Sequence, residues 1–139
     1  MTKIRLSGVS ILLLSLALLS CAGDTKPHLG KLIDDYNQAL RWKHLQTVSS
    51  LTSPAILEIS LARVSARLER IEIADFSIVS IKVNKEANRA YVVVKYTWYE
   101  PPDMVLKTGY EVQEWTRQKD MWYFSGRKPL TGRRKSPFL

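Results

Sequence analysis

The spacing of apolar residues along the chain changes from a helical period to an alternating one near residue 70. The first helical stripe predicts an amphipathic helix and consists of Leu29, Leu32, Ile33, Tyr36 and Leu40. A later stripe predicts another helix and consists of Leu57, Leu61, Val64 and Leu68. Ser53 and Pro54 indicate its start, as N-cap and first helical residue. Between the two stripes, residues 42–48 either extend the first helix or form a short one.

From residue 71 onward the alternation predicts strands. Its parity slips twice before residue 84, as one or two β-bulges would cause. Ala90–Glu100 is the clearest strand, Pro101 and Pro102 interrupt it, and residues 106–119 and 121–124 predict two more. Tyr110 and Val112 indicate one face of the third strand. Trp115 has the opposite parity, so that another bulge would be needed to bring it to the same face. Helices followed by strands predict an α+β fold, with N-terminal helices packed on a strongly bent antiparallel sheet of about four strands.

The first twenty residues have the pattern of an export signal. Lys3 and Arg5 precede an apolar run that is too short for a comfortable membrane span. The run ends in Leu18-Leu19-Ser20-Cys21, which resembles the lipobox of bacterial lipoproteins. This resemblance implies lipidation of Cys21, the only cysteine of the chain, after removal of residues 1–20. Ala22 follows the cysteine, and by the same resemblance the protein is expected on the periplasmic face of the outer membrane of a Gram-negative cell envelope.

Positive charge is concentrated at the end of the sequence. The whole chain has a formal net charge of +8, but residues 21–124 carry 14 basic and 13 acidic residues. A nearly neutral body argues against a nucleic-acid-binding face. We expect residues 126–139 to form a mobile basic tail, either solvated or in contact with an anionic surface such as lipid headgroups. The basic residues of this stretch are Arg127, Lys128, Arg133, Arg134 and Lys135.

The order of elements resembles the NTF2-like superfamily, in which N-terminal helices pack into the concave side of a bent sheet. The residues that carry the resemblance are the 29–40 helix, the restart at Ser53-Pro54, and the closing hairpin Glu114–Trp122. It covers residues 28–125 as a single domain, which follows a lipidated tether at 21–27. A cystatin-like arrangement of helix on sheet is the alternative. The NTF2-like resemblance implies a pocket between helices and sheet that serves small ligands, catalysis or protein partners.

Few residues offer chemistry for catalysis. Asp34, Asp35, Asp75 and His44 could act with Tyr36, but each of the first four reads more simply as a solvated, turn or packing residue. The sequence contains no nucleophile elbow and no phosphate-binding loop. Its two histidines and single cysteine offer no spaced set of metal ligands. We therefore expect no enzyme activity, no metal site and no cofactor.

Aromatic residues are frequent in the predicted strands and fill a core or line a binding face. The mixed face of the clearest strand, with Tyr91, Lys95 and Tyr99, together with Tyr36, is the candidate pocket or partner face. Three functions stay open. The first is a non-enzymatic envelope lipoprotein that binds a small apolar ligand or an envelope protein. The second is an NTF2-like hydrolase or isomerase that uses Asp34 or Asp75. The third is a structural accessory subunit of an envelope assembly.

Overall fold

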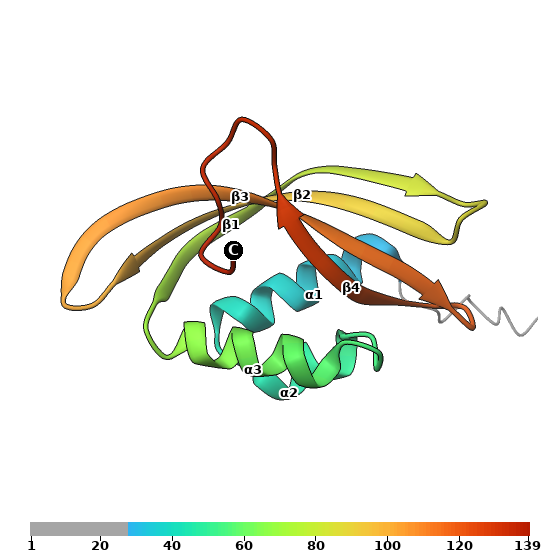
Figure 1. The fold of residues 1–139 in the computed structure, drawn as a ribbon, viewed down its shortest axis with the longest axis horizontal. Coiled ribbons are helices and arrows are strands. Elements are labelled where there is room, and N and C mark those ends of the chain that lie inside the picture. Colours follow the sequence, from blue (N-terminus) through green and yellow to red (C-terminus); the bar gives the residue numbers. More distant parts are fainter. Residues whose placement is uncertain (1–27) are drawn as a thin grey trace, which may run out of the picture.

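The computed structural model describes residues 28–139, which form three helices on one side of a four-stranded antiparallel sheet (Figure 1). The helices are α1 (Leu29–Arg41), α2 (Leu45–Leu51) and α3 (Leu57–Leu68). The strands are β1 (Glu72–Asn84), β2 (Arg89–Glu100), β3 (Asp103–Gln118) and β4 (Met121–Pro129). They pair in chain order as a meander, so that β1 and β4 are the edges. The predicted α+β fold is confirmed. The predicted signal peptide, Cys21 and the tether lie outside the described residues.

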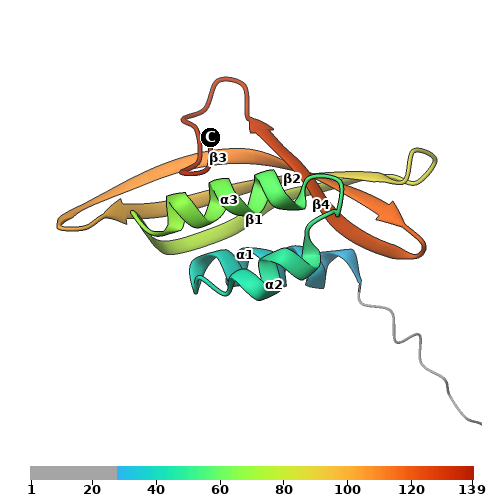
Figure 2. The same ribbon diagram turned by 60° about the horizontal axis from the view of Figure 1, so that its bottom comes forward.

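The helices cover the inner side of the curved sheet (Figures 1 and 2). Helix α1 buries Ile33, Tyr36 and Leu40 completely, which are residues of the predicted stripe. They face the alternate residues of β2 that point inward, namely Ala90, Val92, Val94, Tyr96 and Trp98. Full burial of one such side chain contributes about 1.5–3 kcal/mol. Residues 28–139 therefore enclose a continuous core of their own, as an independently folding domain does.

The connection between the helices differs in one detail from the prediction. The short helix α2 occupies the ambiguous segment, but α3 begins at Leu57 and its N-cap position is Ile56. Ser53 is buried, and its backbone N–H donates to the carbonyl of Phe124 at 2.8 Å. This bond ties the segment to β4, and a turn then precedes the helix. The prediction of Ser53 as N-cap was wrong, because the backbone of Ser53 is hydrogen-bonded to β4 and a turn separates this residue from α3.

The register of the sheet explains its curvature. Between β1 and β2 the pairing shifts at Ile73/Asp75 and at Ile78/Ser80, which confirms the two slips in alternation. Bulges of this kind increase local twist and bend a strand. Between β3 and β4 another shift lies at Glu114/Trp115. Trp115, however, reaches the core by plain alternation with Glu111 and Gln113, and all three are fully buried. The inner face of β3 is thus the polar one, opposite to Tyr110 and Val112.

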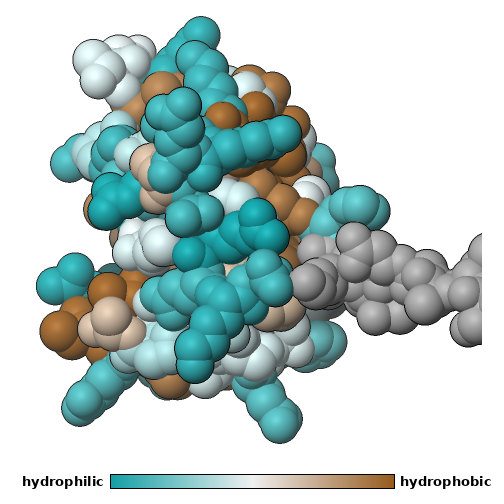
Figure 3. Space-filling model, turned by 90° about the vertical axis from the view of Figure 1, so that its right-hand side faces the viewer, coloured by the Kyte–Doolittle hydropathy of each residue, from teal (hydrophilic) through white to brown (hydrophobic). Residues whose placement is uncertain are grey.

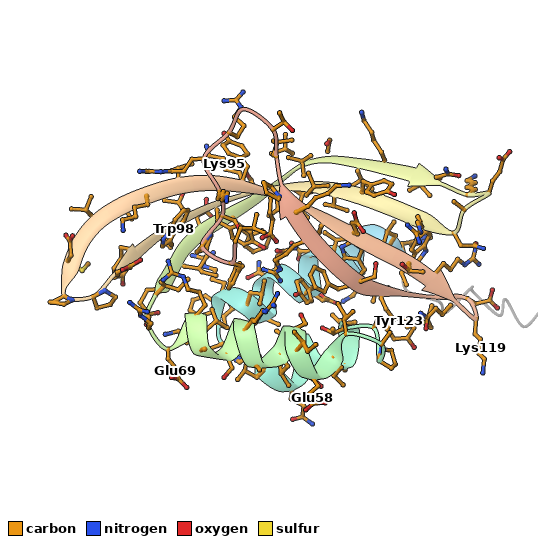
Figure 4. All side chains as sticks on the ribbon, viewed as in Figure 1. Glu58, Glu69, Lys95, Trp98, Lys119 and Tyr123 are labelled. Carbon is orange, nitrogen blue, oxygen red and sulfur yellow. The ribbon has the colours of Figure 1, made fainter. Side chains whose placement is uncertain are left out.

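The β1–β2 and β3–β4 turns lie at the same end of the sheet (Figure 1), and there the N–H of Arg117 in β3 donates to the carbonyl of Asn88 in the β1–β2 turn at 2.9 Å. Lys119 and Asp120 both have positive φ in the β3–β4 turn, the conformation that suits a two-residue hairpin loop. This end of the molecule is predominantly hydrophilic (Figure 3). Figure 4 shows Lys119 at its extremity.

The C-terminal residues are part of the fold rather than a mobile tail. Strand β4 runs to Pro129, so the expected domain boundary at residue 125 was wrong. After a loop, the chain returns to β3 just beyond its pairing with β4, where Tyr110 N–H donates to the Arg134 carbonyl at 2.8 Å and Ser136 N–H donates to the Tyr110 carbonyl at 3.0 Å. We call residues 134–139 the C-terminal strap. Ser136 and Pro137 of the strap are buried, and the chain ends beneath the sheet, above α3 (Figure 1). The strap is held because it forms hydrogen bonds with the part of β3 that β4 leaves unpaired.

Candidate functional site: a pocket beside a buried polar network

A network of buried polar side chains lies between α1 and the inner face of the sheet. At its centre, Nε2 of Gln113 lies 2.9 Å from Oδ1 of Asn37, 3.0 Å from the Tyr96 hydroxyl and 3.0 Å from Oε1 of Glu111. Asn37 also donates to the Ile33 carbonyl at 2.8 Å, within its own helix. All of these groups are fully buried, so each hydrogen bond offsets a desolvation cost. The network joins the helix and two strands into one rigid unit.

Tyr96 contributes a hydroxyl that stays protonated. It donates to Oδ1 of Asn37 and lies 3.3 Å from Oε1 of Glu111. Burial raises the pKa of the Tyr96 hydroxyl well above its usual value, and the Glu111 carboxylate adds to the shift because a second negative charge nearby is unfavourable. Tyr96 is therefore a neutral hydrogen-bond donor at physiological pH.

Arg127 connects this network to the outside. Its Nη1 lies 3.4 Å from Oε2 of Glu111, and its Nη2 donates to the Tyr36 hydroxyl at 2.7 Å. Its guanidinium also lies over two aromatic rings, 4.9 Å from the centroid of Phe124 and 4.6 Å from that of Phe138. Planar stacking and a forked donor set are properties that lysine does not share. The guanidinium is thus held in position by these four side chains.

The charges of these groups are settled by their neighbours. Burial raises the pKa of Tyr36 to about 12, against a smaller opposite effect of Arg127. For Arg127 burial alone would lower the pKa, but the carboxylate of Glu111, followed by the Tyr36 hydroxyl, outweighs it and the net shift is upward. Arg127 is accordingly charged, Tyr36 is neutral, and the positive charge of Arg127 is balanced within the protein by Glu111.

The strap closes the network from below. Ser136 Oγ donates to Oε2 of Glu111 at 2.6 Å, and the ring of Phe138 packs edge-on against Tyr96, with centroids 5.5 Å apart. Nε of Arg67 on α3 donates to the carbonyl of Pro137 at 2.6 Å. Glu111 consequently has no contact with solvent, and the strap separates it from the space outside.

A pocket of about 610 Å³ lies between α3, β4 and the strap. This volume is in the range of small-molecule sites, ~300–1,000 Å³. Its walls are mainly apolar and are formed by Ile56, Ile59, Val64, Phe124, Phe138 and Leu139. Two guanidinium groups, Arg63 and Arg127, line it as well, with Ser60 and Ser125. The pocket can therefore hold an apolar body and offer hydrogen-bond donors to one end of it.

The predicted binding residues do not converge on this pocket. Tyr36 is fully buried behind Arg127. Tyr91, Lys95 and Tyr99 alternate with the inward-facing residues of β2 and lie on the outer face, where Figure 4 shows Lys95 on the side away from the helices. There, Nζ of Lys128 lies 4.8 Å from the ring centroid of Tyr91. The prediction thus combined a core residue of α1 with residues on the outer face of β2.

The basic residues of the C-terminal stretch also separate. Arg127 points inward and pairs with Glu111, so its assignment to a surface contact was wrong. Lys128 is exposed but lies 3.0 Å from Glu114. Arg133 stacks over Tyr110 at 5.4 Å, and Arg134 and Lys135 are exposed. The burial of Arg127 follows from its place on the inner face of β4, which the sequence could not distinguish from a tail.

The nominated acid–base residues lie away from the pocket. Asp34 and His44 are exposed, and Asp35 pairs with Lys31. Asp75 is on the surface of β1, with its Oδ1 3.8 Å from Nη1 of Arg41. Neither Asp34 nor Asp75 lines this pocket, so the structure does not bring these carboxylates to the place where that hypothesis needs them.

The central polar residues were missed because they interrupt an apolar face. Asn37 lies within the apolar stripe of α1, and Glu111 and Gln113 have the same parity as Trp115 in β3. Their shared parity with a buried tryptophan is the signal that could have found them. Within residues 28–139, no group of three or more His, Cys, Asp or Glu side chains is placed to hold a metal ion. None of the helices in this part of the chain is long and apolar enough to cross a membrane.

Comparison with known proteins supports the fold. Neither a protein-family model nor a curated protein sequence matches the chain. A SEC-C motif containing protein from Rhodopseudomonas palustris is similar in structure with a TM-score of 0.62 and 14% identity, over 71% of this chain and 76% of that one. A putative dehydratase from the NTF2-like family of Streptomyces avermitilis gives a TM-score of 0.56 and 18% identity, over 74% of this chain and 94% of that one.

An LEH-like epoxide hydrolase from M. tuberculosis is also similar, with a TM-score of 0.52 and 8% identity, over 68% of this chain and 79% of that one. At such low identities the similarity concerns the fold alone. It supports the resemblance to NTF2-like domains, and function has to be argued from the site.

Proposed function

We propose that this chain is a lipid-anchored protein of the bacterial cell envelope that binds a small, mainly apolar molecule in the pocket between α3, β4 and the strap. The observation that carries the proposal is the pocket itself. Apolar side chains form most of its walls, and a fixed guanidinium, Arg127, lies at its inner side. Such a combination of apolar walls with a few placed polar groups is typical of ligand sites.

The anchor rests on the sequence. Leu18–Cys21 has the lipobox pattern, and Cys21 is the only thiol of the chain. Lipidation at Cys21 would hold the protein to the membrane, and Ala22 directs it to the periplasmic face of the outer membrane. The partners in this proposal are the membrane, through the lipid, and either a small apolar ligand or an envelope protein. Nucleic acid is not among them, because an exported protein seldom meets it.

The pocket can be tested with a neutral apolar dye. Residues 28–139 are titrated with Nile red, whose fluorescence rises in apolar surroundings. Saturable binding is expected, and Ile59→Glu should abolish it because Ile59 lines the pocket. Ile59 is largely exposed, so the change should leave the fold intact. Ile81→Glu, at an exposed isoleucine of β1 outside the pocket, is the matched control. Equal loss of binding in both variants, or no saturable binding at all, would contradict the proposal.

A hydrolase or isomerase is the second candidate, favoured by the carboxylate of Glu111. This carboxylate lies among the donors Tyr96, Gln113, Ser136 and Arg127, an arrangement that could position a base. In the present structure Glu111 is fully buried behind the strap, so turnover would require the strap to move. Glu111→Gln should then abolish turnover, and circular dichroism of the variant must show that it is still folded, because the change also leaves Arg127 without its anion.

A further inference from the structure

The charged side chains that line the pocket are those of Arg63 and Arg127, both cationic, and no aspartate or glutamate side chain lines it. From this asymmetry, and resting on the proposed function of the pocket, we propose that its ligand is a single-chain amphiphile with an anionic head. The apolar chain lies against Ile56, Ile59 and Phe124, and the head lies at the two guanidinium groups.

Arg127 supplies hydrogen-bond donors rather than net charge. A guanidinium has five N–H donors, and within the described residues two hydrogen bonds of Arg127 are present, to Glu111 and to Tyr36. The remaining donors belong to a group whose side chain is only 11% exposed and is clamped between Phe124 and Phe138. Donors that are desolvated and fixed in this way favour a strong oxygen acceptor.

Arg63 supplies the net charge. It lies on the pocket side of α3, four residues after Ile59 and so one helical turn further along the same face. The structure gives it no ion pair or hydrogen bond with any residue of 28–139, whereas Arg67, the next arginine of α3, is engaged with Glu100 and Pro137. The charge of Arg63 is therefore available to a ligand.

Other head groups fit less well. A cationic head would meet two guanidinium groups and no acidic side chain among the lining residues. A neutral alcohol could accept one hydrogen bond but would leave the charge of Arg63 without a partner. A carboxylate or a phosphate monoester matches both the fork of an arginine and its charge. A free fatty acid and a lipid phosphate share this chemistry.

The test compares ligands that have the same ten-carbon chain and different heads. Decanoate, decyl phosphate, 1-decanol and decyltrimethylammonium are titrated into residues 28–139 by calorimetry, below the concentrations at which they form micelles. The two anions are expected to bind about tenfold or more tightly than the alcohol, and the cation most weakly. The order of decanoate and decyl phosphate tells whether the natural head is of the carboxylate or the phosphate kind.

Two variants test whether binding of the anions depends on Arg63. Arg63→Gln should weaken binding of both anions by about three- to tenfold and leave 1-decanol unchanged. Arg70→Gln, at an exposed arginine beyond α3 that does not line the pocket, should change nothing. Binding of none of the four compounds would refute the proposed pocket function itself. Equal affinity for the alcohol and the anions, or an Arg63→Gln variant with unchanged anion affinity, would overturn the anionic head while the pocket function stands.

Discussion

Arg127 and Glu111 form a buried ion pair, in which Nη1 lies 3.4 Å from Oε2 and the two side chains are 11% and 0% exposed. Glu111 comes from the middle of β3 and Arg127 from the last part of β4, so the pair crosses the final hairpin. Each residue also has neutral partners, Ser136 for the carboxylate and Tyr36 for the guanidinium. The pair is thus compensated as a unit, and its two halves depend on each other.

Removal of one partner should therefore cost more than removal of both. Arg127→Met leaves the Glu111 carboxylate buried without its cation, and we expect a loss of about 3–5 kcal/mol in the free energy of unfolding. The double variant Arg127→Met/Glu111→Leu should regain most of that loss, since no buried charge remains. Urea unfolding followed by circular dichroism measures both. A loss below about 1 kcal/mol in the single variant would show that the pair is not closed to water.

The position of the strap requires that residue 109 has no side chain. A Cβ atom at Gly109 would lie 2.0 Å from the carbonyl oxygen of Lys135, a backbone atom that cannot move aside without displacing the strap. Gly109→Ala should lower the free energy of unfolding by about 1–3 kcal/mol, as overpacking does. Gly30→Ala is the control, because nothing lies within 4 Å of its Cβ position, and in α1 it should be neutral or stabilise by up to about 1 kcal/mol.

Hydrogen exchange distinguishes a displaced strap from a general loss of stability. In Gly109→Ala, the amide of Tyr110, which donates to Arg134, should exchange faster relative to core amides of β2. A uniform increase in exchange rate across the whole sheet would mean that the substitution lowers global stability and does not displace the strap.

The sequence predicts most of the fold because its period changes where the structure changes. The stripe of α1 and the alternation of β2 are strong signals, since each buries one face on the core. The two parity slips of β1 appear as register shifts at Ile73/Asp75 and Ile78/Ser80. Local pattern was sufficient in these cases because the buried residues are apolar.

The site could not be predicted in the same way, since its members are polar residues on a buried face. Glu111 and Gln113 look like the solvated side of a strand, and their burial is compensated by hydrogen-bond partners from α1, β2, β4 and the strap. Arg127 is the first residue of a stretch rich in basic and turn-forming residues, which is typical of a tail. Its ring contacts with Phe124 and Phe138 exist only after the strap folds back. The burial of Glu111 and Gln113 and the position of Arg127 both depend on contacts between segments that are far apart in the sequence, and no local pattern encodes such contacts.

The buried tyrosines cause the free energy of unfolding to decrease at alkaline pH. The pKa of Tyr36 is raised to about 12 in the folded protein from 10.0. Above pH 10 the unfolded chain loses this proton while the folded protein keeps it, so the unfolded state binds fewer protons and stability falls as pH rises. The contribution is fully present below pH 10 and is lost between about pH 10 and 12, with a total of about 2–3 kcal/mol for Tyr36.

Comparison of wild type with Tyr36→Phe isolates this effect. The free energy of unfolding is measured at pH 8.5 and pH 11 for both. We expect the decrease between the two pH values to be smaller in the variant, although Tyr96 and the lysines contribute equally to both proteins. Identical decreases would mean that Tyr36 ionises as readily in the folded protein as in the unfolded chain.

The anchor is tested separately from the folded body. Cys21→Ala removes the thiol that lipidation requires, and we expect the full chain to lose its acyl groups and to leave the membrane fraction or to accumulate uncleaved. Each buried methylene contributes about 0.8 kcal/mol, and several acyl chains together hold a protein durably where one does not. Mass spectrometry of the membrane-extracted wild type should show a mature chain that begins at Cys21 and carries the added acyl mass. An unmodified cysteine in the wild type, together with unchanged membrane attachment of Cys21→Ala, would refute the lipoprotein assignment, and the pocket of residues 28–139 would then have to be considered without a membrane beside it.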